Sequence, residues 1–394
     1  MKKFKLNEPM ISLIENFEKL IDYLSINEVS VGSKTKFISS KFLFELNSIM
    51  SIKEENINNR STELSYPFLH LLSNLVRKGE IFRIEEKNSS KSFLKPTKYI
   101  EQFKNLKDTE KYIYLLETLW VDCDFEELRF QTYDFMTEVS VMNFLLELPK
   151  DKVSETFTLG HIGRYLSIIK YFYYFGLLTY KESEEYKSKE EGRVFDPIEI
   201  TINPLGMRII NILCKKRELV LWNKAYRKKL GDWDFKVNKK FYLAFVNFFE
   251  EGELSKTINK NRLGGNEVYT FKVSLGRNNW CKIKLPSHLT FEDLHNCIQE
   301  AFEFDNDHMY AFFMDGKPWS YNSINCPFSE KGPYADKIRI KNYPLYKKQK
   351  FIYIFDFGYE WRFKVEVFDI KENGEVITLN PEILEVKGSV DQYD

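Results

Sequence analysis

The stretch FIYIFDFGYEWRFKVEV, residues 351–367, has the clearest pattern in the chain. Apolar side chains occupy the odd-numbered positions on both sides of a short break at residues 358–360. This period of two on either side of a break predicts two half-buried strands joined by a tight turn. Gly358 in that break is expected to supply a positive φ or a β-bulge.

Two carboxylates, Asp356 and Glu360, flank this break. Paired carboxylates can act as a general acid and base or can hold a metal ion, and His308 is a candidate to join them. An Asp before a Gly is also common turn chemistry, in which the carboxylate binds the backbone two residues on. We favour this structural interpretation and keep the catalytic one as the alternative.

The alternating pattern begins at Val268 and continues through most of the C-terminal third. It is interrupted at residues 291–302, where apolar residues recur at helical spacing. Thr290 and Asp293 stand at the start of that segment with the spacing of a capping box. The sequence therefore predicts an α+β domain of β-hairpins packed on one main helix.

The first 235 or so residues read mostly as helices, and one arrangement of elements occurs twice. Each copy is a helix that ends near a glycine, Gly79 or Gly176, followed by a short apolar strand, a polar or charged loop and a second strand. We expect Gly79 to correspond to Gly176 and Pro96 to Pro204, as a weak internal duplication. A helix followed by a two-stranded wing is typical of winged-helix proteins.

Four regions are predicted on this basis. They are a first winged-helix-like unit at residues 1–122, a second unit with a basic helix at 123–250, a polar linker at 251–267, and the α+β domain at 268–394.

Composition excludes several classes of protein. Lys plus Arg and Asp plus Glu both number 58, so the formal net charge of zero argues against a globally basic nucleic-acid binder. Five cysteines without a CxxC pair predict reduced, buried thiols in a cytoplasmic protein. No apolar run of about 18 residues occurs, so we expect no membrane span. No cofactor motif and no metal-ligand spacing is present, and the oligomeric state stays open.

A basic run at residues 215–229 and three basic residues near the second winged-helix-like unit are candidate phosphate contacts. The alternative is a solvated helix face. The acidic loop of the second wing argues against DNA. The candidate nucleic-acid-binding residues are Arg164, Lys170, Arg208, Lys224, Arg227, Lys228 and Lys229.

Two segments carry a family resemblance: LPSHLTFEDLHNCIQEAFEFDNDHMYAFFMDGK, residues 285–317, and the opening stretch. Residues 268–370 resemble the Ri-plasmid ORF-three-like family, whose members occur on plasmids and in insertion sequences. The matching residues are Leu294, His295, Ile298, Gln299, Phe302, His308, Tyr310, Phe312, Asp356, Phe357, Gly358 and Trp361. Tyr359 and Phe363 replace a usual Asp and His of the family. The resemblance implies no established reaction.

We therefore predict a non-enzymatic accessory protein of plasmid or mobile-element type that binds nucleic acid or a protein partner through its winged-helix-like units. The alternative is a protein–protein scaffold that does not bind DNA, in a defence or mobile-element complex. A third hypothesis is a hydrolase or nuclease that uses Asp356, Glu360 and His308.

Overall fold

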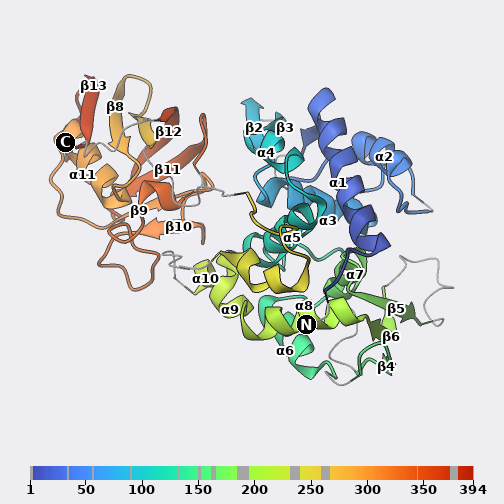
Figure 1. Ribbon diagram of the computed structural model, residues 1–394. Helices are drawn as coiled ribbons and strands as arrows, with labels where there is room; N and C mark the ends of the chain where they lie inside the picture. The colour runs from blue at the N-terminus through green and yellow to red at the C-terminus, as the bar shows by residue number, and fades with distance from the viewer. Residues whose placement is uncertain are drawn as a thin grey trace. The chain divides into compact units, whose positions relative to one another are not determined.

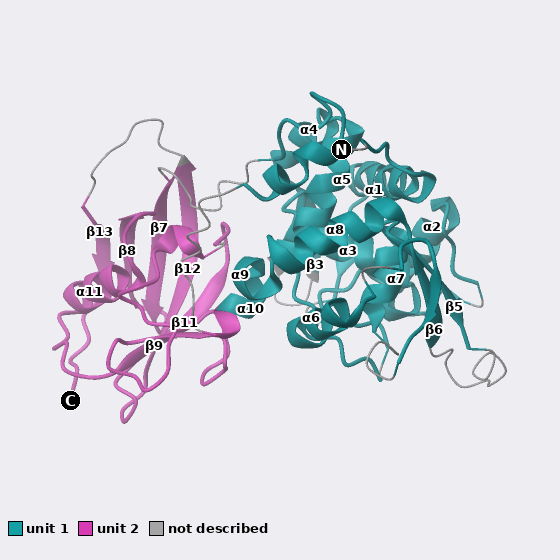
Figure 2. Cartoon of the chain, turned by 60° about the horizontal axis from the view of Figure 1, so that its bottom comes forward, with its two compact units in different colours: residues 1–227, 237–258 teal, residues 228–236, 259–394 magenta. Residues whose placement is uncertain are grey.

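The chain divides into two compact units in the computed structural model (Figure 1). Unit 1 is residues 1–227 with 237–258, and unit 2 is residues 228–236 with 259–394 (Figure 2). The structure describes residues 3–32, 35–55, 57–88, 91–131, 133–149, 152–160, 166–183, 195–230, 240–258, 267–343, 345–372 and 380–393. Helices and antiparallel sheets both occur, which confirms the α+β class.

The first half of unit 1 forms a small helical layer with a three-stranded sheet. Its elements are α1 (Glu8–Ile26), β1 (Ser30–Val31), α2 (Ser40–Ile49), the 3-10 helix η1 (Glu63–Ser65), α3 (Pro67–Lys78), β2 (Phe82–Asn88) and β3 (Lys91–Pro96). The sheet is antiparallel in the order β1-β3-β2. The short first strand therefore pairs with the last strand of the β2–β3 hairpin.

The second half of unit 1 repeats this arrangement after three helices. The elements are α4 (Tyr99–Lys104), α5 (Asp108–Glu117), the π-helix η2 (Thr118–Asp122), α6 (Glu138–Glu147), β4 (Thr156–Thr158), α7 (Ser167–Tyr174), β5 (Leu178–Glu182), β6 (Pro197–Ile202) and α8 (Pro204–Lys215). The sheet order is β4-β6-β5, so a short strand again pairs with the last strand of a hairpin. Both halves contribute to one hydrophobic core.

The two repeats align differently from the sequence-based expectation. The backbone N–H of Ile81 donates to the Val76 carbonyl, and that of Leu177 donates to the Phe172 carbonyl, which closes α3 and α7 in the same way. The left-handed residue just before each donor is Glu80, with φ 63°, in the first repeat and Gly176, with φ 65°, in the second. Glu80 rather than Gly79 therefore corresponds to Gly176.

The strand register moves the proline alignment as well. Phe82 pairs with Pro96 at the start of the first hairpin, and Leu178 pairs with Ile202 at the same place in the second. Pro96 therefore corresponds to Ile202 and not to Pro204. Identical residue types misled the sequence alignment, because backbone geometry rather than residue identity is what the two copies share.

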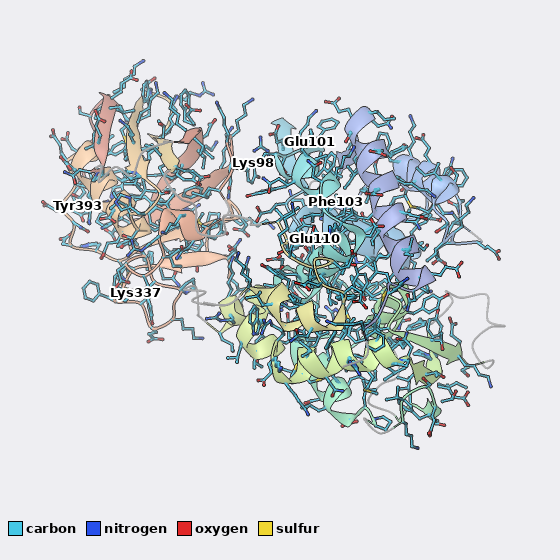
Figure 3. The ribbon with its side chains drawn as sticks, viewed as in Figure 1. Lys98, Glu101, Phe103, Glu110, Lys337 and Tyr393 are labelled. Carbon is cyan, nitrogen blue, oxygen red and sulfur yellow. The ribbon has the colours of Figure 1, made fainter. Side chains whose placement is uncertain are left out.

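Unit 1 ends in short helices and a segment that returns to α5. The helices are α9 (Leu219–Trp222), α10 (Lys224–Lys229), η3 (Phe241–Ala244) and η4 (Val246–Phe248); the last two residues of α10 already belong to unit 2. Glu110, labelled in Figure 3, accepts hydrogen bonds from the backbone N–H groups of Ser255 and Lys256 at 3.2 and 3.1 Å. Its carboxylate also accepts from the backbone N–H of Lys107, the N-cap of α5. Lys107 has the extended backbone that an N-cap requires.

Unit 2 is a seven-stranded antiparallel sheet with one main helix. Its elements are β7 (Glu267–Leu275), β8 (Asn279–Pro286), α11 (Phe291–Phe302), β9 (Tyr310–Phe313), β10 (Ser323–Asn325), the 3-10 helix η5 (Ile340–Asn342), β11 (Lys350–Phe355), β12 (Trp361–Glu372) and β13 (Glu382–Lys387). The strand order is β10-β9-β11-β12-β7-β8-β13. The predicted hairpin at residues 351–367 is β11 and β12, with Phe355 opposite Trp361.

The apolar face of α11 packs on one side of this sheet and forms the core of unit 2. The predicted capping box is present: Thr290 Oγ1 accepts from the Asp293 backbone N–H, and the Asp293 carboxylate accepts from the Thr290 N–H. All five cysteines are buried thiols outside any disulfide. In the part of the chain that the structure describes, no helix combines the length and the apolar character needed to cross a membrane.

Candidate functional site

Helix α3, which precedes the β2–β3 hairpin of unit 1, is buried on all sides. The ten residues 67–76 are all buried. The Phe68 ring lies 4.8 Å from that of Tyr174 in α7, and His70 Nε2 lies 3.1 Å from the Glu127 carbonyl oxygen. A helix that reads DNA needs an exposed face to enter the major groove. In this structure α3 has no such face over residues 67–76.

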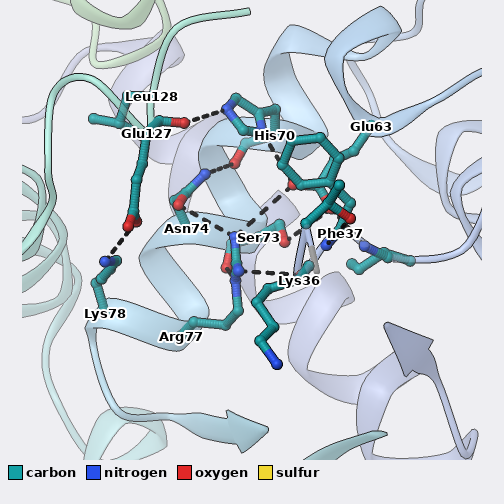
Figure 4. A network of polar contacts seen from close by, with 12 residues as sticks. Lys36, Phe37, Glu63, His70, Ser73, Asn74, Arg77, Lys78, Glu127 and Leu128 are labelled. Atoms are coloured by element: carbon teal, nitrogen blue, oxygen red, sulfur yellow. Dashed lines mark hydrogen bonds and ion pairs between the residues drawn. The ribbon is translucent and has the colours of Figure 1, made fainter. Parts of the chain in front are cut away.

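A buried polar network fixes α3 to the loop before it (Figure 4). The Glu63 carboxylate is fully buried and lies 2.9 Å from His70 Nδ1, and its other oxygen accepts from the Ile38 backbone N–H at 2.7 Å. Ser73 Oγ donates to that second oxygen, Oε2, and the Arg77 guanidinium lies 3.9 Å from Oε1, the oxygen that faces His70. A buried carboxylate is stable only when it is paired and hydrogen-bonded, as here. The network is therefore a structural anchor of α3.

Two of the three candidate basic residues near the second repeat, Lys170 and Arg208, contact aromatic rings within the protein. Lys170 Nζ lies 5.3 Å from the ring centroid of Phe195, and the Arg208 guanidinium carbon lies 4.9 Å from that of Phe4. Cations over aromatic faces are favourable contacts within the protein itself. Arg164 lies outside the described residues.

The predicted basic helix at residues 215–229 is wrong as a single element. The stretch holds the end of α8 and the short helices α9 and α10, separated by Asn223. Asn223 has an extended backbone; its Oδ1 accepts from the Tyr226 N–H, and its amide donates to the carbonyls of Trp120 and Cys123. A side chain that bonds the backbone in this way stops one helix and caps the next.

The basic side chains of this stretch also bond within the protein. Lys224 Nζ lies 2.8 Å from Asp122 Oδ1, and the Arg227 guanidinium donates to the Leu221 carbonyl at 3.3 Å. Lys228 is partly buried in α10, and Lys229 at its end is exposed. The candidate phosphate contacts are therefore spread over several elements, and most of them already serve the fold.

Unit 1 exposes large apolar side chains in and just before α6. Tyr133 is 66% exposed, Phe135 72%, Val139 50% and Leu146 55%. Val139 and Leu146 are seven residues apart, so they lie on the same side of the helix. Large apolar side chains gathered on a surface are typical of a protein interface, whereas scattered single ones need no explanation.

In unit 2, the hairpin turn after β11 is held by the Asp356 side chain. Its Oδ1 accepts hydrogen bonds from the backbone N–H groups of Gly358, at 2.9 Å, and Tyr359, at 3.2 Å. The Glu360 N–H donates to the Asp356 carbonyl oxygen at 2.6 Å and closes the turn. The Asp356 carboxylate therefore has a structural role in this turn.

The expectation that Gly358 adopts a positive φ is wrong. The left-handed residues of the turn are Asp356 and Glu360, with φ of 53° and 58°. A Cβ built on Gly358 would lie 3.3 Å from Asp356 Oδ1, a tight contact with no left-handed backbone. Asp enters the left-handed region more readily than most residues because its short side chain bonds the local backbone. That bonding explains why Asp356 takes the unusual conformation.

His308 comes together with Asp356, as the catalytic alternative requires. Its Nε2 lies 3.3 Å from Asp356 Oδ2, and its Nδ1 lies 3.0 Å from Asp307 Oδ1. The Tyr393 hydroxyl lies 3.5 Å from the same Nε2. His308 is 39% exposed, so the imidazole bridges the buried turn and the surface.

Glu360 belongs to a different set of contacts. Its Oε2 accepts from the Arg362 guanidinium, and its Oε1 accepts from Trp319 Nε1 at 3.1 Å. The two carboxylates that flank the turn are thus held by different partners. Among the described residues, no group of three or more His, Cys, Asp or Glu side chains is placed to hold a metal ion.

A second polar cluster lies in the core of unit 2, between α11 and the sheet. His295 is buried, and its ring stacks on that of Tyr310 with centroids 3.6 Å apart. Its Nδ1 lies 2.6 Å from the Tyr353 hydroxyl and its Nε2 lies 2.7 Å from Asn306 Oδ1. The Gln299 amide donates to the same hydroxyl at 2.8 Å.

These contacts fix the proton positions. Asn306 presents its oxygen to His295 because its amide nitrogen donates to Asn296, so His295 Nε2 carries the proton. Nδ1 is then the acceptor, and the Tyr353 hydroxyl donates to it. Burial lowers the pKa of His295 to about 4, although the bond to Asn306 acts in the opposite direction. The imidazole is therefore neutral near pH 7, which suits a structural core histidine.

The sequence gives only part of this cluster. His295 and Gln299 are four residues apart on the inward face of a helix, which is a visible signal. Asn306 and Tyr353 come from a loop and a distant strand, and no spacing in the sequence joins them to His295. Two atoms of the cluster, Gln299 Oε1 and the Tyr310 hydroxyl, are buried and have no hydrogen-bond partner among the described residues.

The comparisons with known proteins concern unit 2. Residues 267–392 match the family described as plasmid pRiA4b ORF-3-like protein. This match confirms the resemblance inferred from the sequence. Among solved structures, a protein of unknown function from Methanosarcina mazei Go1 matches with 24% identity and a TM-score of 0.27, over 32% of this chain and 71% of that chain. No curated protein matches the chain.

The two departures from the plasmid pRiA4b ORF-3-like pattern are aromatic in this chain and pack as aromatic residues do. The Tyr359 ring stacks on that of Trp361, with centroids 5.0 Å apart. Phe363 is fully buried, and its ring lies 4.9 Å from Phe302. Both positions therefore carry packing contacts in this chain.

Proposed function

We propose that this chain is a non-enzymatic accessory protein of plasmid or mobile-element type that binds a protein partner. Its two repeats are winged-helix-like units that act as a scaffold and do not bind DNA. The element order of each repeat, with a short strand pairing to the last strand of a hairpin, supports the winged-helix assignment. The match of unit 2 to the plasmid pRiA4b ORF-3-like family supports the plasmid or mobile-element class.

The burial of α3 is the observation that carries this proposal. A winged-helix protein reads DNA with the helix that stands before its wing, and here that helix is covered over residues 67–76. The internal contacts of Lys170, Arg208 and Lys224 point the same way, because cations engaged within the fold are poor phosphate contacts.

A hydrolase or nuclease built on unit 2 has less support. Such an enzyme would need Asp356 and Glu360 free to act on one substrate. Asp356 instead holds the turn, and Glu360 faces Arg362 and Trp319. The His308–Asp356 pair has Asp307 and Tyr393 beside it, but Glu360, the second carboxylate of this hypothesis, bonds elsewhere.

The partner surface in this proposal is the apolar region at residues 133–146. Aromatic side chains such as Tyr133 and Phe135 are the residue types that most often dominate binding energy at protein interfaces. In unit 1 they precede Val139 and Leu146 of α6, so an apolar groove or helix of a protein partner fits the surface better than a nucleic acid does.

The test is quantitative mass spectrometry of proteins that co-purify with the chain from cells that carry it naturally. The variant combines Phe135→Ser and Leu146→Ser, and the matched control is Ile26→Ser, an apolar residue of α1 that is 83% exposed. We expect one protein to co-purify with the wild type and the control and to be lost with the variant. An identical set of proteins in all three samples would contradict the proposal.

A further inference from the structure

The last strand of unit 2, β13, stands at the edge of the sheet beside β8 (Figure 2). Among the described residues, no strand pairs with its other side. Leu384 and Val386 in this strand are 46% and 48% exposed. An exposed edge strand with apolar side chains is a template for pairing with another strand. An edge strand of this kind must either be shielded from other strands or pair with one.

A β-bulge in β13 decides which way its side chains point. Ile383 pairs with Ile283 and Glu385 with Lys282, so Leu384 is the extra residue between them. Ile383 and Val386, which pairs with Cys281, therefore lie on the face that α11 covers. Glu382 and Lys387 are five residues apart, and because of the bulge both lie on the opposite, outer face.

Cross-strand Glu–Lys ion pairs join β13 to β8 on the outer face of the sheet. Glu382 lies 3.1 Å from Lys284 and Glu385 lies 2.9 Å from Lys282, both on β8. Lys387 is exposed at the end of β13 and forms no ion pair with any residue that the structure describes. Lys387 thus extends the row of charged residues on the outer face of β13, but no Glu among the described residues pairs with it.

We propose that β13 pairs with β13 of a second copy of this chain, antiparallel about a two-fold axis between Leu384 and Glu385. This register places Glu382 opposite Lys387 twice, both on the outer face, and Ile383 opposite Val386 twice, both on the α11 face. A two-fold interface must be self-complementary, and this strand meets that condition in charge, in apolar character and in side-chain direction. The two sheets join into one.

The test is analytical ultracentrifugation of the full chain over a wide range of protein concentration. We expect a concentration-dependent dimer for the wild type. Lys387→Glu should weaken the dimer at least about tenfold, because two opposite-charge pairs become like-charge pairs. Glu382→Lys should weaken it similarly, and the double variant Glu382→Lys/Lys387→Glu should restore it.

The matched control is Lys364→Glu, which makes the same charge change on the exposed side of the inner strand β12. It should leave the dimer unchanged. Lys387→Glu breaks no ion pair seen within the described residues, so it should fold as the wild type does, which circular dichroism can verify. A wild-type monomer at every concentration would overturn the proposal, and so would a double variant that fails to regain the dimer. Equal weakening by Lys364→Glu and Lys387→Glu would also overturn it.

Discussion

Replacing Tyr353 by Phe tests whether the buried polar cluster of unit 2 is a structural network. The change removes one hydroxyl and leaves two buried groups, His295 Nδ1 and the Gln299 amide, without their partner. Leaving a buried polar group unsatisfied costs about 1–3 kcal/mol. The expected loss in the free energy of unfolding of unit 2 is therefore about 2–6 kcal/mol. The ring itself stays, so cavity formation adds little.

Tyr310→Phe is the matched control, because the Tyr310 hydroxyl is buried without a partner among the described residues. Removing an unsatisfied hydroxyl should be neutral or slightly stabilising. Urea unfolding followed by pulsed hydrogen exchange and mass spectrometry reports the peptides of β8 and α11 separately from those of unit 1. A Tyr353→Phe variant within about 0.5 kcal/mol of the wild type would refute the reasoning, since surface-like substitutions have effects of that size. A Tyr310→Phe variant as damaged as Tyr353→Phe would refute it as well.

Two further predictions concern the turn in unit 2 and the returning segment of unit 1. At position 356, Asn should cost less than about 1 kcal/mol because it keeps the local hydrogen bonds and tolerates a left-handed backbone, whereas Val should cost more than about 2 kcal/mol, as thermal unfolding can measure. Burial alone would raise the pKa of Glu110, but hydrogen bonds from Lys107, Ser255 and Lys256 lower it below its ordinary value of 4.5. Because the folded pKa is depressed, this stabilisation is complete above pH 4.5 and is lost as the pH falls through the folded pKa. The protection factors of the amides of residues 252–258, taken relative to the intrinsic exchange rate at each pH, should therefore fall below pH 4.5 in the wild type, and Glu110→Gln should lower them at pH 7. Unchanged protection in both cases would contradict the role of Glu110.

Local patterns in the sequence predicted local structure well. The period-two alternation at residues 351–367 gives β11 and β12, and the spacing of Thr290 and Asp293 gives the capping box. Both features depend on residues close together in the chain, so the sequence carries the whole signal. The family motifs likewise lie in two continuous stretches, and the match to residues 267–392 confirms them.

Features that depend on distant residues could not be predicted. The burial of α3 comes from contacts such as that of Phe68 with Tyr174, which are far apart in sequence. The sequence of α3 predicts a helix. It does not show which distant element covers the remaining face of that helix. The division of the basic stretch was missed for a similar reason, because Asn223 stops the helix by bonding the carbonyls of Trp120 and Cys123.

The central claim is that the winged-helix-like repeats serve as a scaffold and do not read DNA. Fluorescence anisotropy of labelled duplex and single-stranded DNA, titrated with the full chain at low and then rising salt, tests it most directly. A protein that neutralises several phosphates shows a slope of about −0.9 per contact in log K against log salt on duplex DNA. We predict no saturable, salt-sensitive binding to either DNA even at low ionic strength. Saturable binding with a slope of several contacts, weakened by changing Lys224, Arg227, Lys228 and Lys229 to Gln, would contradict the account.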